Sequence, residues 1–146
     1  MNIVESLKEK FSGTIKQFRI DSNSKIYIEI DKKDLLNMVY FIFVDMDARF
    51  ITASGVDNLD GMEILYHFSF DREDVIISLR VLLERENPII ESISSIIRGA
   101  INIEKEIYEL LGIQFLHHPE LKRFLLSEEY PDNVYPLRKD NREGKK

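Results

Sequence analysis

Alternation of apolar and polar residues constrains the fold of this chain more than any other feature. The segment 25–30 places an isoleucine at every second position, and 62–70 does the same with large apolar residues. Successive side chains of a β-strand point to opposite faces, so this pattern predicts strands with one buried face. The run 75–83 is apolar almost throughout, which predicts a central strand covered on both sides. With further strands expected at 14–20 and 50–54, these segments indicate a sheet.

Helical spacing appears before and between these strands. Ile3, Leu7 and Phe11 predict a short amphipathic helix that ends near Gly13. A second helix is expected from Asp31, a good N-cap residue, to about position 44. The loop after the third strand is expected at 55–61, where Asp, Asn and Gly are frequent. The fold class is therefore α+β, a mainly antiparallel sheet with helices packed on one face.

The last third of the chain changes character. A helical segment is expected at 91–111, with Asn102 as a plausible N-cap and Gly112 at a left-handed C-cap. Beyond it, apolar residues continue with little periodicity and with several prolines, so this part has no obvious place in the core. We therefore expect an α+β domain at 1–111 and an extended partner-binding tail at 112–146.

Bulk composition excludes several classes of protein. The chain has 146 residues, a net charge of −6 and no cysteine. This charge argues against nucleic acid or an anionic lipid surface as a partner. Without cysteine the chain has no disulfide, cysteine nucleophile or thiolate-held iron–sulfur cluster. Its charged beginning and short apolar runs predict a cytoplasmic protein with no direct membrane insertion, associated with a membrane only through partners.

Two groups of polar residues suggest specific chemistry. His117 and His118 with Glu120 suggest a metal site, but adjacent histidines point in different directions, so a packing role for His118 beside Pro119 is favoured. The glutamates 104, 106 and 109 suggest acid–base chemistry, but nothing indicates a substrate cleft around them. A solvated or salt-bridged face is the favoured interpretation, and contact with a basic residue of a partner is the alternative. No nucleotide-binding loop is present, so we expect no cofactor and no catalysis by this chain alone.

A set of spaced residues in the last third forms a specific pattern. It comprises Ser92, Ala100, Glu104-Lys105-Glu106, Glu109-Leu110, Gly112-Ile113, Phe115, His118-Pro119, Leu121, Arg123, Leu125, Tyr130 and Pro136-Leu137-Arg138-Lys139-Asp140. This pattern resembles the 30-kilodalton subunit family of respiratory complex I, which includes subunits of energy-converting membrane-bound nickel–iron hydrogenases. Lys105 stands where that family has arginine, Glu109 where it has aspartate, His117 where it has glycine, and Asn102 where it has an aromatic residue. These departures concern the branch of the family, and the short chain favours a hydrogenase-type or other minimal complex.

The resemblance implies a non-catalytic, cofactor-free structural subunit in the cytoplasmic arm of a membrane redox complex. Its implied partners are the large catalytic subunit, against which it packs, and a neighbouring iron–sulfur subunit. The predicted interface residues are Glu104, Glu106, His118, Pro119, Arg123, Pro136, Leu137, Arg138 and Asp140. The alternative is a free-standing regulatory or ligand-binding α+β module, which co-purification with such a complex would exclude.

Overall fold

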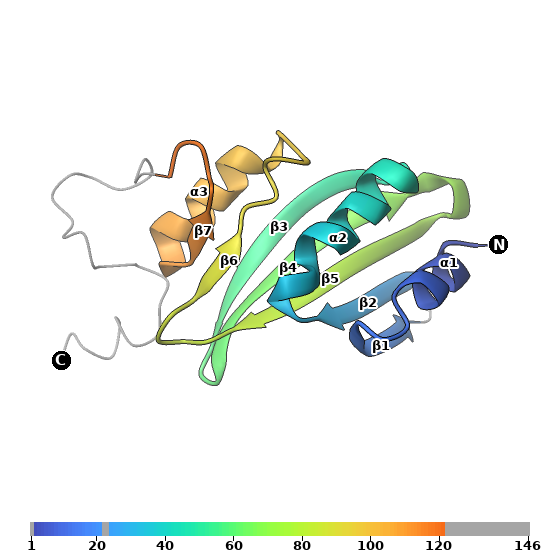
Figure 1. Cartoon of the computed structure of the whole chain (residues 1–146), viewed down its shortest axis with the longest axis horizontal. Coiled ribbons are helices and arrows are strands. Elements are labelled where there is room, and N and C mark those ends of the chain that lie inside the picture. Colours follow the sequence, from blue (N-terminus) through green and yellow to red (C-terminus); the bar gives the residue numbers. More distant parts are fainter. Residues whose placement is uncertain (1, 22–23, 122–146) are drawn as a thin grey trace, which may run out of the picture. The chain divides into compact units, whose positions relative to one another are not determined.

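A computed structural model describes residues 2–21 and 24–121, and Figure 1 shows the path of the chain. The predicted α+β class is confirmed, with a mixed but mostly antiparallel sheet. The chain divides into two compact units. The first comprises Met1–Ala53 and Leu65–Val81, and the second comprises Ser54–Ile64 and Leu82–Lys146.

Seven strands and three α-helices are described, together with short 3-10 and π-helical segments. In chain order they are α1 (Ile3–Lys10), β1 (Ile15–Asp21), β2 (Lys25–Ile30), the 3-10 turn η1 (Lys32–Asp34), α2 (Leu35–Tyr40), the π-helix η2 (Phe41–Asp45), β3 (Arg49–Asn58), β4 (Gly61–Phe70), the 3-10 turn η3 (Asp71–Glu73), β5 (Val75–Leu83), β6 (Ile89–Glu91), α3 (Ala100–Leu111) and β7 (Gln114–Leu116). Strands β2 and β5 occupy the predicted positions 25–30 and 75–83.

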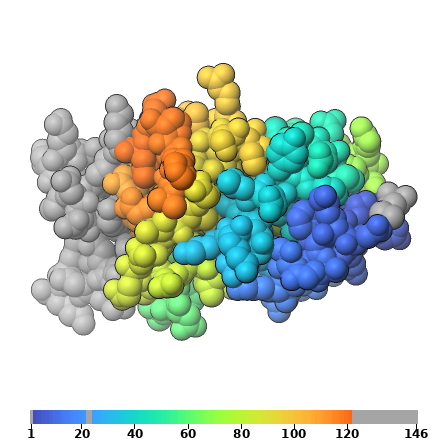
Figure 2. Space-filling model, viewed as in Figure 1, coloured from blue at the N-terminus to red at the C-terminus, as the bar shows by residue number. Residues whose placement is uncertain are grey.

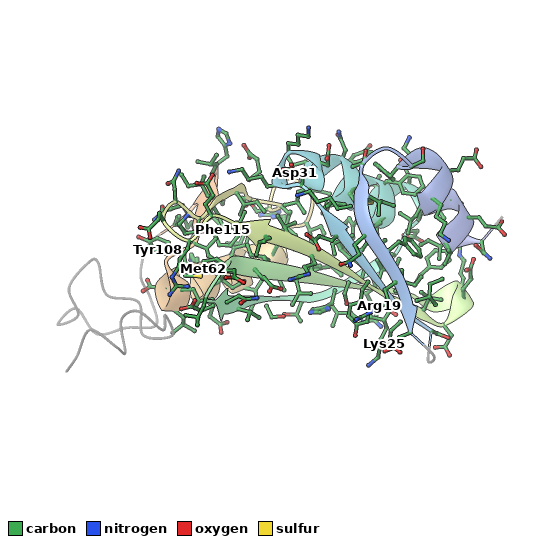
Figure 3. The ribbon with its side chains drawn as sticks, turned by 90° about the horizontal axis from the view of Figure 1, so that it is seen from below. Arg19, Lys25, Asp31, Met62, Tyr108 and Phe115 are labelled. Carbon is green, nitrogen blue, oxygen red and sulfur yellow. The ribbon has the colours of Figure 1, made fainter. Side chains whose placement is uncertain are left out.

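The five-stranded sheet has the order β1-β2-β5-β4-β3. β1 and β2 form an antiparallel hairpin, with Arg19 and Lys25 near its end in Figure 3. β2 and β5 are parallel and pair Ile28 with Leu79. The central place predicted for β5 is therefore correct. Its predicted cover on both sides is wrong in part, because Ile76 is 37% exposed and Leu82 is 43% exposed.

Helices α1 and α2 of the first unit lie on the same face of the sheet (Figure 1), and their surfaces adjoin in Figure 2. The Asn2 side chain accepts from the Glu5 backbone N–H at 2.9 Å and caps α1, while Ile3 and Leu7 are fully buried. The alternating isoleucines of β2 are also buried, at 1% exposure or less. Burial of this apolar face supplies the main driving force for folding the first unit.

The second unit contains α3 and the short parallel pair β6 and β7. Figure 2 shows the segment around β7, in orange, against the yellow segment that includes β6. Helix α3 begins at Ala100 instead of about position 91, because Ile89–Glu91 form a strand and turns follow it. Its N-cap position is Gly99, so the assignment of Asn102 as N-cap is wrong. The C-cap at Gly112 is left-handed, with a φ of 78°, as predicted.

Two further expectations need correction. β3 continues to Asn58, so the predicted loop at 55–61 shrinks to a tight turn between β3 and β4. Gly55 lies inside this strand. A glycine suits this position because an added Cβ would stand 2.6 Å from Leu111 Cδ1 of α3. The expectation that residues after Gly112 have no place in a core is wrong for Ile113 and Phe115, which are 0% and 3% exposed.

The remaining part of the predicted tail, 122–146, lies outside the described residues. Within the part of the chain that the structure describes, no helix is long and apolar enough to span a bilayer.

Candidate partner interface

Residues from three places in the sequence pattern meet inside the second unit. We call Glu104, Ser92, Ile93 and His118 the Glu104 cluster. Glu104 lies on α3, Ser92 and Ile93 follow β6, and His118 follows β7. The cluster therefore joins the helix to the segments on either side of it, next to the position where the described chain ends.

The Glu104 carboxylate is fully buried and has two hydrogen-bond donors. Ser92 Oγ lies 2.6 Å from Oε1, and the Ile93 backbone N–H donates to Oε2 at 2.9 Å. Burial raises the pKa of Glu104 from 4.5 to about 7, although the hydrogen bonds from Ser92 and Ile93 act in the opposite direction. The raised pKa means that the loss of hydration destabilises the ionised carboxylate more than the two hydrogen bonds stabilise it.

The hydroxyl of Ser92 lets the cluster adapt to either charge state of Glu104. Ser92 Oγ lies 2.7 Å from Ser94 Oγ, and it accepts from the Ser94 backbone N–H at 3.0 Å. When Glu104 is ionised, Ser92 donates to the carboxylate. When Glu104 is protonated, its own O–H donates to Ser92, whose hydroxyl turns to Ser94. No buried polar group of the cluster needs to lose its partner on protonation.

His118 connects α3 to the segment after β7. Its side chain is fully buried. The Glu120 backbone N–H donates to Nδ1 at 3.0 Å, so Nε2 carries the proton and donates to the Ile101 carbonyl at 2.9 Å. This arrangement defines the neutral Nε2–H tautomer. Nε2 also lies 3.8 Å from Glu104 Oε1, which brings the two titratable groups together.

One ion pair and one histidine–carboxylate contact surround the cluster. Lys105 Nζ lies 2.9 Å from Glu120 Oε1, and His117 Nδ1 lies 2.9 Å from Glu91 Oε1. The Glu120 side chain is 57% exposed and the His117 side chain is 81% exposed. An ion pair that solvent reaches, as it reaches Glu120, contributes about 0–1 kcal/mol. These contacts and the buried cluster together hold the segment 117–120 against α3 and β6.

His117 adopts a left-handed backbone with a φ of 65°. Glycine reaches this region without steric cost, whereas other L-residues are strained there. The geometry explains why glycine at this position, as in the resembled family pattern, suits the bend after β7. The contact between His117 and Glu91 partly offsets the strain in this chain.

The predicted interface residues have different surroundings. Glu104 and Glu109 are 0% exposed, so the expectation of a solvated face is wrong for both. Glu106 is half-buried on α3, Pro119 is exposed, and the side chain of His118 is buried. The others, Arg123, Pro136, Leu137, Arg138 and Asp140, lie outside the described residues. Their contact with a partner, like that of Glu104, Glu106, His118 and Pro119, remains a prediction.

The histidines do not converge on a common ligand position. His117 contacts Glu91, whereas His118 contacts backbone groups, and the carboxylate of Glu120 pairs with Lys105. Among residues 2–21 and 24–121, no group of three or more potential ligands is arranged to hold a metal ion. The chemistry of the cluster is to hold a buried turn and the start of the C-terminal segment in fixed positions.

Sequence reasoning missed the contacts that unite the cluster. Ser92 was identified only as part of the pattern, and its contact with Glu104 depends on the turn between β6 and α3. The pairing of Lys105 with Glu120 joins a helix to a segment beyond the next strand. The family pattern was the one sequence feature that pointed to this cluster, because those of its members that the structure describes lie in or next to α3.

Comparison with known proteins gives consistent results. Residues 28–146 match the family model described as "Respiratory-chain NADH dehydrogenase, 30 Kd subunit". The chain is 35% identical over 144 residues to a subunit of the F(420)H(2) dehydrogenase of Methanosarcina mazei, covering 94% of this chain and 89% of the relative. It is 28% identical to a subunit of the NADH-quinone oxidoreductase of Chelativorans sp., covering 92% of this chain and 68% of the relative.

Two solved structures share the fold. A trypsin-resistant fragment of Nqo5 matches with a TM-score of 0.71 and 17% identity, covering 83% of this chain and all of the fragment. A chain of the membrane-bound sulfane sulfur reductase, an archaeal respiratory membrane complex, matches with a TM-score of 0.80 and 14% identity. That match covers 94% of this chain and 82% of the other.

Proposed function

Because the chain belongs to the 30-kilodalton subunit family of the respiratory-chain NADH dehydrogenase, we propose that it is a non-catalytic, cofactor-free structural subunit of a membrane redox complex. Members of this family are subunits of multi-subunit respiratory complexes, and this chain is an oxidoreductase subunit. In the proposal, the chain packs against the large catalytic subunit, with an iron–sulfur subunit nearby. Electron transfer takes place in those neighbours.

The Glu104 cluster is the observation that carries this proposal. A buried carboxylate and a buried imidazole hold residues 92–93 and 118–120 around α3. Such a network holds residues 118–120, at the end of the described chain, in a fixed position against α3. A segment that starts from a fixed position loses less conformational entropy when a partner orders it. The arrangement therefore suits a subunit that docks through its C-terminal residues.

Sequence identity supports a minimal complex as the branch of the family. This chain is 35% identical to the relative from the F(420)H(2) dehydrogenase and 28% identical to the relative from the Chelativorans NADH-quinone oxidoreductase. In our proposal it is a subunit of an F(420)H(2) dehydrogenase-type or hydrogenase-type complex. Purification of the native complex, followed by assays with reduced F(420), NADH and reduced ferredoxin as donors, tests this branch.

Replacement of Arg138 by alanine tests the docking role of the tail. Pro136 restricts the backbone before it, and an arginine offers a planar group that binds a carboxylate in a bidentate way. If Arg138 is buried against the large subunit, the variant should weaken assembly by about 2–5 kcal/mol. Arg142→Ala is the matched control, because it removes the same charge just outside the motif.

Two measurements are needed on both arginine variants. Pull-down of the complex should lose the large subunit with Arg138→Ala and retain it with Arg142→Ala. If neither arginine contributes to the folded core, the free energy of unfolding of the isolated chain should change by less than about 0.5 kcal/mol in thermal unfolding. Full recovery of the complex with Arg138→Ala, or a large loss of chain stability, contradicts the proposed role.

Co-purification separates this proposal from the alternative of a free-standing module. A tagged chain, expressed at its native level and isolated in mild detergent, should bring down a hydrogenase-like large subunit. Recovery of the chain alone, under conditions that keep the respiratory complexes intact, favours a regulatory or ligand-binding module.

A further inference from the structure

A small groove with two lysines lies between α1 and the edge strand β1 of the first unit. Its volume is about 270 Å³, and it is lined by Lys8, Ser12, Ile15, Lys16, Gln17 and Phe18. This is below the roughly 300–1,000 Å³ typical of pockets that enclose a small molecule. The groove is therefore suited to individual side chains of a larger partner. Figure 2 shows the adjoining blue surface of α1 and β1.

The two lysines of this groove differ from three arginines of the fold. Arg49, Arg80 and Arg85 each pair with a carboxylate. Within residues 2–21 and 24–121, neither Lys8 nor Lys16 has a carboxylate at ion-pair distance. The chain as a whole has a net charge of −6, so two such lysines in one groove form a local reversal of charge.

One of the lysines is held in place by an aromatic ring. Lys8 Nζ lies 4.7 Å from the centroid of the Phe18 ring, within the range of a cation–π contact. Phe18 projects from β1 and Lys8 from α1, so the contact spans the groove. It reduces the freedom of the lysine without neutralising its charge. The ammonium group thus remains available to an anion.

The strand beside the groove has an open backbone edge. β1 is the terminal strand in the order β1-β2-β5-β4-β3, so its outer side has no strand neighbour among the described residues. Such edges accept extended segments of other proteins through main-chain hydrogen bonds. The irregular register between Ile15 and Gln17 limits regular pairing at the start of β1. An occupant therefore depends on side-chain contacts as well as on the strand edge.

We propose that the α1–β1 groove docks an extended acidic segment of a partner protein, whose carboxylates pair with Lys8 and Lys16. Ser12 and Gln17 supply further hydrogen-bond donors at the rim, and Ile15 and Phe18 supply apolar contact. Carboxylates satisfy the two cations, and the extended backbone follows the open edge of β1. This surface involves none of the residues on which the proposed tail docking rests, so either proposal can fail without the other.

Fluorescence anisotropy with a labelled hexaglutamate peptide tests the proposal on the full chain. The peptide should bind at low salt and weaken as ionic strength rises. The double variant Lys8→Gln/Lys16→Gln should reduce affinity by about tenfold, as expected for loss of two surface charge contacts. The control variant Lys32→Gln/Lys33→Gln removes the same charge from the exposed turn η1 and should change affinity by less than about twofold. A labelled hexaglutamine peptide should not bind.

Several outcomes would overturn the assignment. Equal losses in the two double variants would show diffuse attraction without a defined groove. Displacement of the peptide by an equal concentration of inorganic phosphate would indicate a general anion site. A dimer of the unmodified chain that the Lys8→Gln/Lys16→Gln variant dissociates, measured by sedimentation, would indicate a second copy as the occupant. Equal far-ultraviolet circular dichroism and melting of both variants confirm that folding is not the cause of any difference.

Discussion

Replacing Glu104 with glutamine should remove a pH-dependent loss of stability from the second unit. Burial raises the pKa of Glu104 from 4.5 to about 7. Each pKa unit corresponds to about 1.4 kcal/mol of differential stabilisation between the two protonation states. The shift therefore corresponds to about 3 kcal/mol of folding free energy that depends on pH.

The sign of this pH dependence follows from whether the folded or the unfolded chain binds the Glu104 proton more tightly. The folded pKa lies above the unfolded value, so the folded chain holds more protons between pH 4.5 and about 7. The favourable contribution of protonated Glu104 is complete below the unfolded pKa. It is lost as the pH rises through the folded pKa. A glutamine stays neutral throughout, while its carbonyl accepts from Ile93 and its amide donates to Ser92.

Urea unfolding of the isolated chain measures the effect. Between about pH 5 and about pH 8, the unmodified chain should lose about 2–3 kcal/mol more unfolding free energy than Glu104→Gln. The comparison cancels the titrations of groups that lie far from Glu104 and are shared by the two proteins. Glu106→Gln is the matched control, because it changes a half-buried residue of the same helix and should retain the pH dependence. Parallel pH profiles for Glu104→Gln and the unmodified chain would refute the reasoning.

Two backbone positions give further predictions. Gly61→Ala should destabilise the chain by about 1–3 kcal/mol in thermal unfolding, because a Cβ there would lie 2.6 Å from the Leu83 carbonyl oxygen. Gly13→Ala is the control, because an added Cβ there would meet no atom within 4 Å. It should cost less than about 1 kcal/mol. Equal melting temperatures for these variants would contradict the close approach. In the same thermal unfolding assay, His117→Gly should be more stable than His117→Ala by about 1 kcal/mol, because the φ of 65° suits glycine. Equal stability of the two variants would argue against that backbone conformation.

Local rules predicted the regular part of the fold well. The period-two pattern located β2 and the apolar run located β5, both with their observed bounds. The period-two pattern also identified Ile64, Tyr66 and Phe68 of β4 as buried, but the expectation of a single buried face is wrong in part, because Glu63 and Ser69 on the other face are buried as well. The left-handed C-cap at Gly112 followed from the absence of a side chain. These features depend on residues close in sequence, where conformational preference and burial agree.

Tertiary contacts decided the features that sequence reasoning missed. Asp57 and Gly55 suggested a loop, but both lie in β3. The absence of a side chain at Gly55 leaves room for Ile107 and Leu111 of α3, and the Asp57 carboxylate pairs with Arg85. Likewise, Glu104 carries a charge that favours solvent, and only its partners Ser92 and Ile93 make its burial tolerable. The family pattern singled out the glutamate without indicating whether it faces a partner or the interior.

If α3 contributes to assembly as proposed, Glu104 and Glu106 should do so in different ways. Glu104 is fully buried and has hydrogen bonds to Ser92 and Ile93 within this chain, so we expect it to affect a partner by holding its own segment in place. Glutamine preserves those contacts, and we expect Glu104→Gln to assemble as well as the unmodified chain. Glu106 is half-buried and is predicted to contact the partner directly, so Glu106→Gln should lower recovery of the large subunit while leaving the isolated chain stable. The measurement is quantitative pull-down of both variants at matched pH. Loss of assembly with Glu104→Gln and normal assembly with Glu106→Gln would show that these two roles are assigned the wrong way round.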